Sequence, residues 1–137
     1  MKLTKTNHIK IYGHRGARGD LPENTLESFK YLFENKISAY ETDILLTKDL
    51  IPVVYHDFRL NPALTKDAQG NWIEDNDIKI FDLTYEELSK FKIGEIDKKS
   101  KYGRRFDNQK SLGEIKIPKL SDLLELTSNN ISDDLII

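Results

Sequence analysis

Residues 9–46 read IKIYGHRGARGDLPENTLESFKYLFENKISAYETDILL, and this stretch decides the fold. Its first apolar residues, 9–12, run directly into a loop that contains Gly13, Gly16 and Gly19. An apolar run that stops at closely spaced glycines predicts a strand followed by a loop. The glycine spacing does not match the dinucleotide-binding fingerprint, and no Gly-Lys-Ser/Thr follows, so the loop is not a nucleotide-binding loop of either common kind.

A helix is predicted directly after this loop. Asn24 can cap its start, and Glu27, three residues later, can complete a capping box. Four apolar side chains then recur at helical spacing and define one face of the helix. They are Leu26, Phe29, Leu32 and Phe33. We expect the helix to end near Asn35.

Two further strands are expected after the helix. Residues 39–46 alternate between two faces, which places Glu41 and Asp43 on the same side of one strand. After a turn, residues 52–55 form another short strand that leads into His56. Because strands and helices alternate, the fold class is α/β, and a helix between two strands is the connection that parallel pairing requires.

The second half of the chain has a different character. Scattered charges and turn residues over 58–117 predict a segment of loops, with one short helix for which Thr84 and Glu87 form a capping box. A leucine-rich helix is predicted over residues 120–130, and an apolar strand over 133–137.

The composition of the chain argues against several classes of protein. The chain has 137 residues, a net charge of -2 and no cysteine, so we expect one domain without disulfides and without general affinity for nucleic acid. No run of about 18 apolar residues is present, which argues against a membrane span. The polar N-terminal residues 1–8 do not resemble a secretory signal, so the expected location is the cytoplasm.

The carboxylates Glu41 and Asp43 suggest a metal site. Two like charges on one face of a buried strand are costly unless a cation neutralises them. A hard divalent ion with oxygen ligands, Mg²⁺ or Ca²⁺, is the natural partner. An edge strand with its acidic face in water explains the same spacing equally well.

Two histidines stand beside predicted strands. His14 and Arg15 follow the first strand among glycines, where the backbone can approach an anion closely and an arginine can bind phosphate in a bidentate manner. His56 ends another strand and would supply a second acid–base group. Taken alone, a tight turn with exposed side chains accounts for His14 and Arg15, and a structural role accounts for His56. Asp57 either orients His56 or forms a turn.

Together these residues resemble the glycerophosphodiester phosphodiesterase family. Four segments carry the resemblance in the family's order: GHRGA at 13–17, PENTLESF at 22–29, ETDI at 41–44 and VVYHD at 53–57. The resemblance implies the N-terminal portion of a (β/α)8 TIM barrel, with an inserted segment over about 58–117 after the second strand region. Residues 1–137 would then form a partial domain of this family.

The resemblance also implies a site of six residues. His14 and His56 would be the catalytic acid–base pair, Arg15 and Glu23 would bind substrate, and Glu41 and Asp43 would hold Mg²⁺ or Ca²⁺. The implied reaction hydrolyses a small-molecule glycerophosphodiester to glycerol 3-phosphate and an alcohol.

The length of the chain leaves alternatives open. A complete (β/α)8 barrel needs about 250 residues, and the family's third metal-binding Glu would fall just beyond residue 137. The chain is therefore either an enzyme of this family or an inactive truncated fragment that retains a phosphate- and metal-binding module. A related lipid phosphodiesterase of the sphingomyelinase-D-like type is a third alternative. Open sheet edges would favour self-association.

Overall fold

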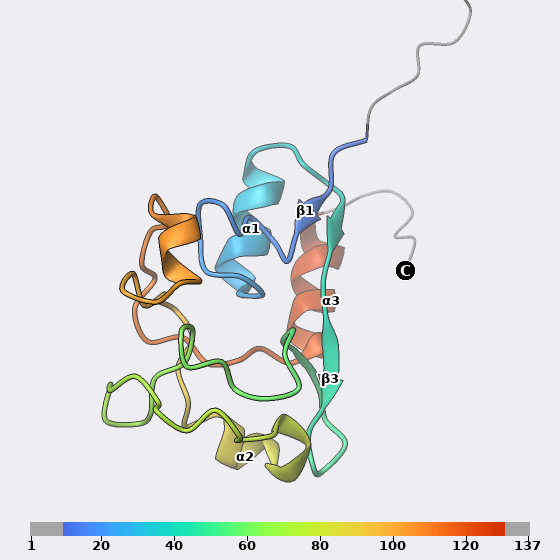
Figure 1. Ribbon diagram of the computed structural model, residues 1–137. Helices are drawn as coiled ribbons and strands as arrows, with labels where there is room; N and C mark the ends of the chain where they lie inside the picture. Colours follow the sequence, from blue (N-terminus) through green and yellow to red (C-terminus); the bar gives the residue numbers. More distant parts are fainter. Residues whose placement is uncertain (1–9, 131–137) are drawn as a thin grey trace, which may run out of the picture.

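The computed structural model describes residues 10–130 (Figure 1). Its first unit is a strand, a helix and a second strand: β1 (Gly13–His14), α1 (Leu26–Glu34) and β2 (Tyr40–Glu41). β1 and β2 pair in parallel, with Gly13 opposite Tyr40 and His14 opposite Glu41. This arrangement confirms the α/β class. The predicted strand over 133–137 lies outside the described residues.

The first strand lies later in the sequence than the apolar run predicts. Among the described residues of that run, 10–12 form no ladder, and pairing begins where the Gly13 N–H donates to the Ala39 carbonyl at 2.9 Å. A Cβ on Gly13 would lie 2.1 Å from Leu32 Cδ1, so glycine at this position leaves room for that side chain of α1.

The capping residue of α1 is Thr25 and not Asn24. Thr25 Oγ1 accepts a hydrogen bond from the Ser28 N–H at 3.2 Å. Asn24 adopts a left-handed backbone with φ of 55°, and its side chain is used for contacts with the neighbouring strand segment. The helix ends at Asn35 as expected.

The predicted strand over 39–46 is two strands with different partners. β2 pairs with β1, whereas β3 (Ile44–Leu46) forms an antiparallel pair with β4 (Pro52–Val54). The change of partner falls at residues 42–43, where the Thr42 and Asp43 side chains hydrogen-bond to Asn24. Local alternation cannot show such a break, because both halves keep the same period.

Residues 58–117 contain few regular elements. These are the 3-10 helix η1 (Ile80–Asp82), the helix α2 (Tyr85–Leu88) and the 3-10 helix η2 (Gly103–Phe106). The capping box between Thr84 and Glu87 is present at the start of α2. Most of this segment is loop that packs around a core shared with β4, made of Val53, Tyr55, Leu60, Ile73, Ile80, Leu88, Ile93 and Ile117.

The last described element, α3 (Leu120–Asn130), matches its prediction. It contacts α1 and β4 and closes a second core formed by Ala17, Phe29, Leu32, Val54 and Leu123. In Figure 1 α3 runs beside the strands, and the segment around η2, drawn in orange, lies beside the loop that precedes α1. Over residues 10–130, no helix has the length and apolar character that crossing a membrane requires.

Candidate functional site

The loop between β1 and α1 turns back on itself and gathers its polar side chains. Arg15 and Gly16 have positive φ angles of 55° and 80°, and the Asn24 N–H donates to the Arg15 carbonyl at 2.8 Å. A Cβ on Gly16 would lie 2.5 Å from Ser28 Oγ, so the close turn requires glycine at this position. The turn brings the residues at the end of β1 next to those that precede α1.

Arg15 is the centre of the site. Its Nη1 donates to Glu23 Oε1 at 3.1 Å, and its Nε lies 3.5 Å from Asp43 Oδ2. The Arg15 backbone N–H donates to Glu41 Oε2 at 3.2 Å. His14 completes the group, with Nε2 3.6 Å from the same Glu41 oxygen. The structure thus brings together five of the six residues that the sequence indicated.

Glu23 is the most buried carboxylate of this group, with 7% of its side chain exposed. One of its oxygens binds Arg15, and the other accepts a hydrogen bond from the Tyr102 hydroxyl. Burial alone would lower the pKa of the Arg15 guanidinium, but the facing Glu23 carboxylate raises it above its ordinary value. Burial, followed by the contact with Glu23, raises the pKa of Tyr102 to about 12. In this geometry Glu23 holds Arg15 in place.

The carboxylates Glu41 and Asp43 lie next to Arg15, and for Glu41 the exposure favours the second of the two alternatives, an acidic side chain in water. The Glu41 side chain is 47% exposed and that of Asp43 is 22% exposed. Within residues 10–130, β2 pairs with β1 and Glu41 is the last residue of that ladder. Repulsion between buried charges therefore does not by itself require a cation here.

The donor set nevertheless fits a hard divalent ion. Within residues 10–130, neither Glu41 Oε1 nor Asp43 Oδ1 takes part in a hydrogen bond, so each carboxylate has one oxygen available as a ligand. In the same range no group of three or more His, Cys, Asp or Glu side chains is placed to hold a metal. Two carboxylates completed by water and substrate oxygens suit Mg²⁺ in particular.

His56 stands apart from the Arg15 group. It follows β4, and the preceding Tyr55 N–H donates to the Asp43 carbonyl at 3.0 Å, which sets the end of β4 beside the acidic pair. His56 Nδ1 lies 2.5 Å from Asp57 Oδ1, and Asn61 Nδ2 donates to the other Asp57 oxygen at 3.0 Å. Asp57 therefore orients His56, one of the two roles that the sequence left open.

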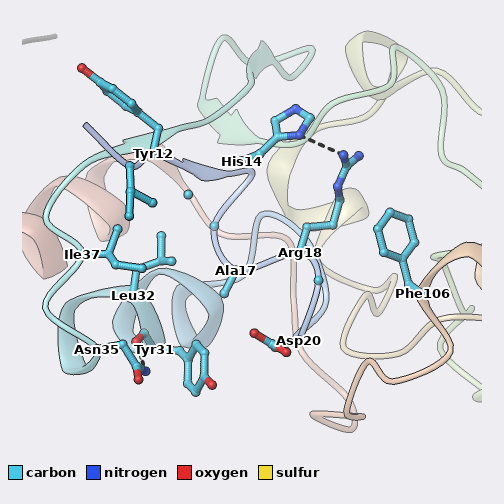
Figure 2. A pocket seen from close by; sticks show the side chains of 14 residues that line it. Tyr12, His14, Ala17, Arg18, Asp20, Tyr31, Leu32, Asn35, Ile37 and Phe106 are labelled. Atoms are coloured by element: carbon cyan, nitrogen blue, oxygen red, sulfur yellow. Dashed lines mark hydrogen bonds between the residues drawn. The ribbon is translucent and has the colours of Figure 1, made fainter. Parts of the chain in front are cut away.

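Sequence reasoning missed Arg18 and Tyr102 as members of the site. Figure 2 shows Arg18 pointing toward His14 at the rim of a cavity of about 480 Å³ between β1, the loop and α1. Tyr102 reaches Glu23 from 79 positions away in the sequence, so no local spacing could have indicated it. Arg18 could have been included from the sequence alone, because it stands in the same glycine-rich loop as His14 and Arg15.

Comparisons with known proteins agree on one family. Residues 14–136 match the model of the glycerophosphoryl diester phosphodiesterase family. A glycerophosphodiester phosphodiesterase of Bacillus altitudinis is 32% identical over 123 residues, which cover 90% of this chain and 42% of the relative. A glycerophosphocholine phosphodiesterase of Schizosaccharomyces pombe is 42% identical over 73 residues, which cover 47% of this chain and 6% of that protein.

Solved structures show the same relationship. A crystal structure from Silicibacter pomeroyi, assigned as a glycerophosphoryl diester phosphodiesterase, superimposes with a TM-score of 0.87 at 39% identity and covers 89% of this chain and 41% of that one. An Oleispira antarctica phosphodiesterase in complex with the product sn-glycerol-3-phosphate has a TM-score of 0.62 at 26% identity, over 89% of this chain and 41% of that one. The chain thus spans less than half the length of these relatives.

Proposed function

The chain belongs to the glycerophosphoryl diester phosphodiesterase family, and from this premise we propose that its site serves the hydrolysis of glycerophosphodiesters to glycerol 3-phosphate and an alcohol. The product complex of the Oleispira antarctica relative supports a small-molecule glycerophosphate ligand. In this proposal residues 1–137 are the N-terminal portion of a (β/α)8 barrel, and 58–117 are its inserted segment.

The observation that carries the proposal is the convergence on Arg15. A guanidinium that Glu23 holds in place at the ends of two parallel strands is preorganised to bind a phosphodiester anion. His14 lies within the same group, because its Nε2 shares the Glu41 oxygen with the Arg15 backbone N–H. An arginine that can bind the anion and a histidine that can transfer a proton therefore lie side by side.

Glu41 and Asp43 would hold the divalent ion, Mg²⁺ or Ca²⁺. When bound, such an ion would neutralise charge on the phosphate as it reacts. The support is the available oxygen on each carboxylate and the exposure of Glu41 to incoming water and substrate.

His14 and His56 carry the proton transfers in this proposal. One ring accepts the proton of the attacking hydroxyl as a new P–O bond forms. Attack by water gives glycerol 3-phosphate directly, whereas attack by the substrate's own glycerol hydroxyl gives a cyclic phosphate that water must then open. The other ring donates a proton to the alcohol oxygen as the old P–O bond breaks. Asp57 accepts a hydrogen bond from His56 Nδ1–H, which leaves Nε2 with the free lone pair.

The test is release of glycerol 3-phosphate from glycerophosphocholine by the purified chain with Mg²⁺ or Ca²⁺. We expect turnover that His14→Ala and a chelator each reduce to background. Lys30→Ala is the matched control, because the contact of Lys30 among residues 10–130 is an exposed ion pair with Glu34 on α1, and its loss should leave turnover unchanged.

The other outcomes separate the alternatives. Folded, metal-loaded protein without turnover, but with phosphate binding that Arg15→Met abolishes, would identify a phosphate- and metal-binding module instead of an enzyme. Turnover of sphingomyelin in place of glycerophosphocholine would identify a lipid phosphodiesterase. Cytoplasmic location and self-association through the sheet edges that residues 10–130 leave unpaired remain parts of the proposal, and fractionation and light scattering can check them.

A further inference from the structure

The charges of the chain are unevenly distributed. Residues 98–110 contain six basic residues and one acidic residue, whereas the whole chain has 21 basic and 23 acidic residues. The six are Lys98, Lys99, Lys101, Arg104, Arg105 and Lys110. This short segment around η2 therefore carries a strong positive charge in a chain whose net charge is -2.

Most of this positive charge is left without a negative partner. Lys99, Lys101, Arg105 and Lys110 are exposed, and within residues 10–130 none of them forms an ion pair. Exposed basic side chains are commonly no more than a solvated surface. What distinguishes this segment is its fixed shape and its attachment to the Arg15 site.

The backbone of the segment is fixed by contacts within it. The Lys98 ammonium donates to the carbonyls of Phe106 and Gln109 at 3.2 and 3.1 Å. A Cβ on Gly103 would lie 1.9 Å from the Asp97 carbonyl oxygen, so the chain passes closely over itself at this point. The exposed basic side chains therefore project from one defined surface.

The same segment is attached to the loop between β1 and α1. The Tyr102 hydroxyl donates to Glu23, and the Lys110 backbone N–H donates to the Asp20 carbonyl at 2.8 Å. Figure 1 shows this segment, drawn in orange, beside the loop that precedes α1. The basic surface is thus held next to the carboxylate that positions Arg15.

Positive groups follow one another from Arg15 to this surface. Arg15 Nη1 lies 3.1 Å from one Glu23 oxygen, and Arg18 Nη1 lies 4.0 Å from the other. The Phe106 ring of η2 lies under the Arg18 guanidinium, with 5.1 Å from Cζ to the ring centroid, and Arg105 directly precedes it. Neighbouring charges of one sign reinforce one another and attract ions of the opposite sign.

We propose that residues 98–110 form a second anion-recognition surface, which selects phosphodiesters whose alcohol part carries a further negatively charged group. Arg15 binds the phosphodiester, and the basic side chains around η2 attract the second anion. A neutral or zwitterionic alcohol gains nothing from this surface. The preference among substrates rests on the proposed function, whereas the preference in binding requires only that the ligand occupies the Arg15 site.

The surface suits a small anion better than an anionic bilayer. Its two aromatic residues, Tyr102 and Phe106, pack on each other with ring centroids 5.2 Å apart and contact Glu23 and Arg18. Neither ring is among the exposed large apolar side chains of residues 10–130. The segment therefore offers no aromatic side chain for insertion into lipid, the usual companion of basic residues on membrane-binding surfaces.

Glycerophosphoinositol and glycerophosphoinositol 4-phosphate are matched probes, because they differ only in a second phosphate on the alcohol. Calorimetric titration with Mg²⁺ in the His14→Ala background measures their binding without consuming them. We expect the 4-phosphate to bind about 5- to 10-fold more tightly, as two or three exposed charge contacts would produce. The difference should shrink as NaCl rises from about 0.05 M to about 0.5 M. Equal affinities, or no binding of either probe, would overturn the proposal.

A double variant tests the residues themselves. Lys101→Gln with Arg105→Gln should reduce the preference to about 2-fold or less and leave the affinity for glycerophosphoinositol unchanged. Lys48→Gln with Lys90→Gln is the matched control, since both lysines are exposed and lie near Glu87 on α2. A preference that persists in the first double variant, or that the control loses equally, would contradict the assignment. The comparison of the two probes stands even where a variant fails to fold.

Two further measurements separate this inference from its neighbours. If the first double variant lost binding to phosphatidylglycerol vesicles but kept the preference between the probes, the surface would be a membrane-docking site and the proposal would be wrong. An inactive wild-type chain whose His14→Ala form shows the expected preference would refute the proposed function and leave this recognition intact. An active wild-type chain with equal kcat/KM for the two probes would do the reverse.

Discussion

Asn24 provides a test of how the site is held together. Its side chain is almost completely buried, with 1% of the residue exposed, and its φ is 55°. Nδ2 donates to Asp43 Oδ2 at 3.1 Å, and Oδ1 accepts from Thr42 Oγ1 at 3.1 Å. We predict that replacing Asn24 lowers the free energy of unfolding even though it leaves the helix cap at Thr25 intact.

The size of the effect follows from these contacts. A hydrogen bond to a charged group contributes about 1.5–3 kcal/mol and a neutral one about 0.5–1.5 kcal/mol, so Asn24→Gly should cost about 2–4.5 kcal/mol. Alanine in left-handed backbone costs about 1–2 kcal/mol more, of which the unfolded-state freedom of glycine offsets about 0.4–1 kcal/mol. Asn24→Ala should therefore be less stable than Asn24→Gly by about 0.5–1 kcal/mol.

Urea denaturation followed by circular dichroism measures both differences. Asn35→Ala is the control, because Asn35 lies at the other end of α1 and its side chain makes an exposed hydrogen bond with the Tyr31 carbonyl at 2.8 Å. This control should lose less than about 1 kcal/mol. The reasoning would be refuted if Asn24→Ala cost no more than Asn35→Ala, or if Asn24→Gly were the less stable of the two Asn24 variants.

Two further predictions concern stability. Burial raises the pKa of Tyr55 and Tyr102 from 10.0 to about 12 in the folded chain, so their contribution to stability is complete below pH 10 and is lost as the pH rises toward 12. Urea midpoints should fall over that interval, and less so in Tyr55→Phe. A tyrosinate absorbance titration in which all six tyrosines share one midpoint near the ordinary pKa of 10.0 would contradict this. Gly94→Ala would place a Cβ 1.9 Å from the Gly113 carbonyl oxygen and should cost about 1–3 kcal/mol. Gly19→Ala meets no atom within 4 Å and should match the wild type in the same titration.

The elements that the sequence predicted well are those that neighbouring residues determine. The start of α2 depends on Thr84 and Glu87, three positions apart, and both hydrogen bonds of the capping box form. The helices α1 and α3 follow from apolar side chains at helical spacing, which needs no knowledge of what they pack against. In each case, interactions between residues close in the sequence were sufficient to predict the helix.

The errors arose where a distant partner competes with a local one. Asn24 is a good helix cap by residue type, but Asp43 and Thr42 bind its side chain across the site, and Thr25 takes the cap. The strand over 39–46 divides for the same reason, since its two halves pair with different strands. A single sequence carries no signal for either competition.

Burial was the property of the candidate site that the sequence predicted least well. The flanking apolar residues suggested a buried Glu41, yet the buried carboxylate is Glu23, which the sequence placed only through a motif. Tyr102 is one of the residues that cover Glu23, and this contact depends on the path of the loop segment that contains Tyr102. Exposure of a side chain depends on such distant neighbours, which periodicity does not encode.

The buried ion pair of Arg15 and Glu23 bears on whether Arg15 has a structural role or a binding role. Taking two charges out of water costs free energy that their attraction only partly offsets, so such pairs are weak contributors to stability. Within the described residues, Arg15 Nε is buried without a hydrogen bond, and it lies 3.5 Å from the Asp43 Oδ2 carboxylate oxygen. A fold under selection for stability alone would not retain an unsatisfied donor on a buried cation. A cation held in a fixed position at the ends of β1 and β2 is, however, what recognition of an anion requires, and this favours a binding role for Arg15 over a purely structural one.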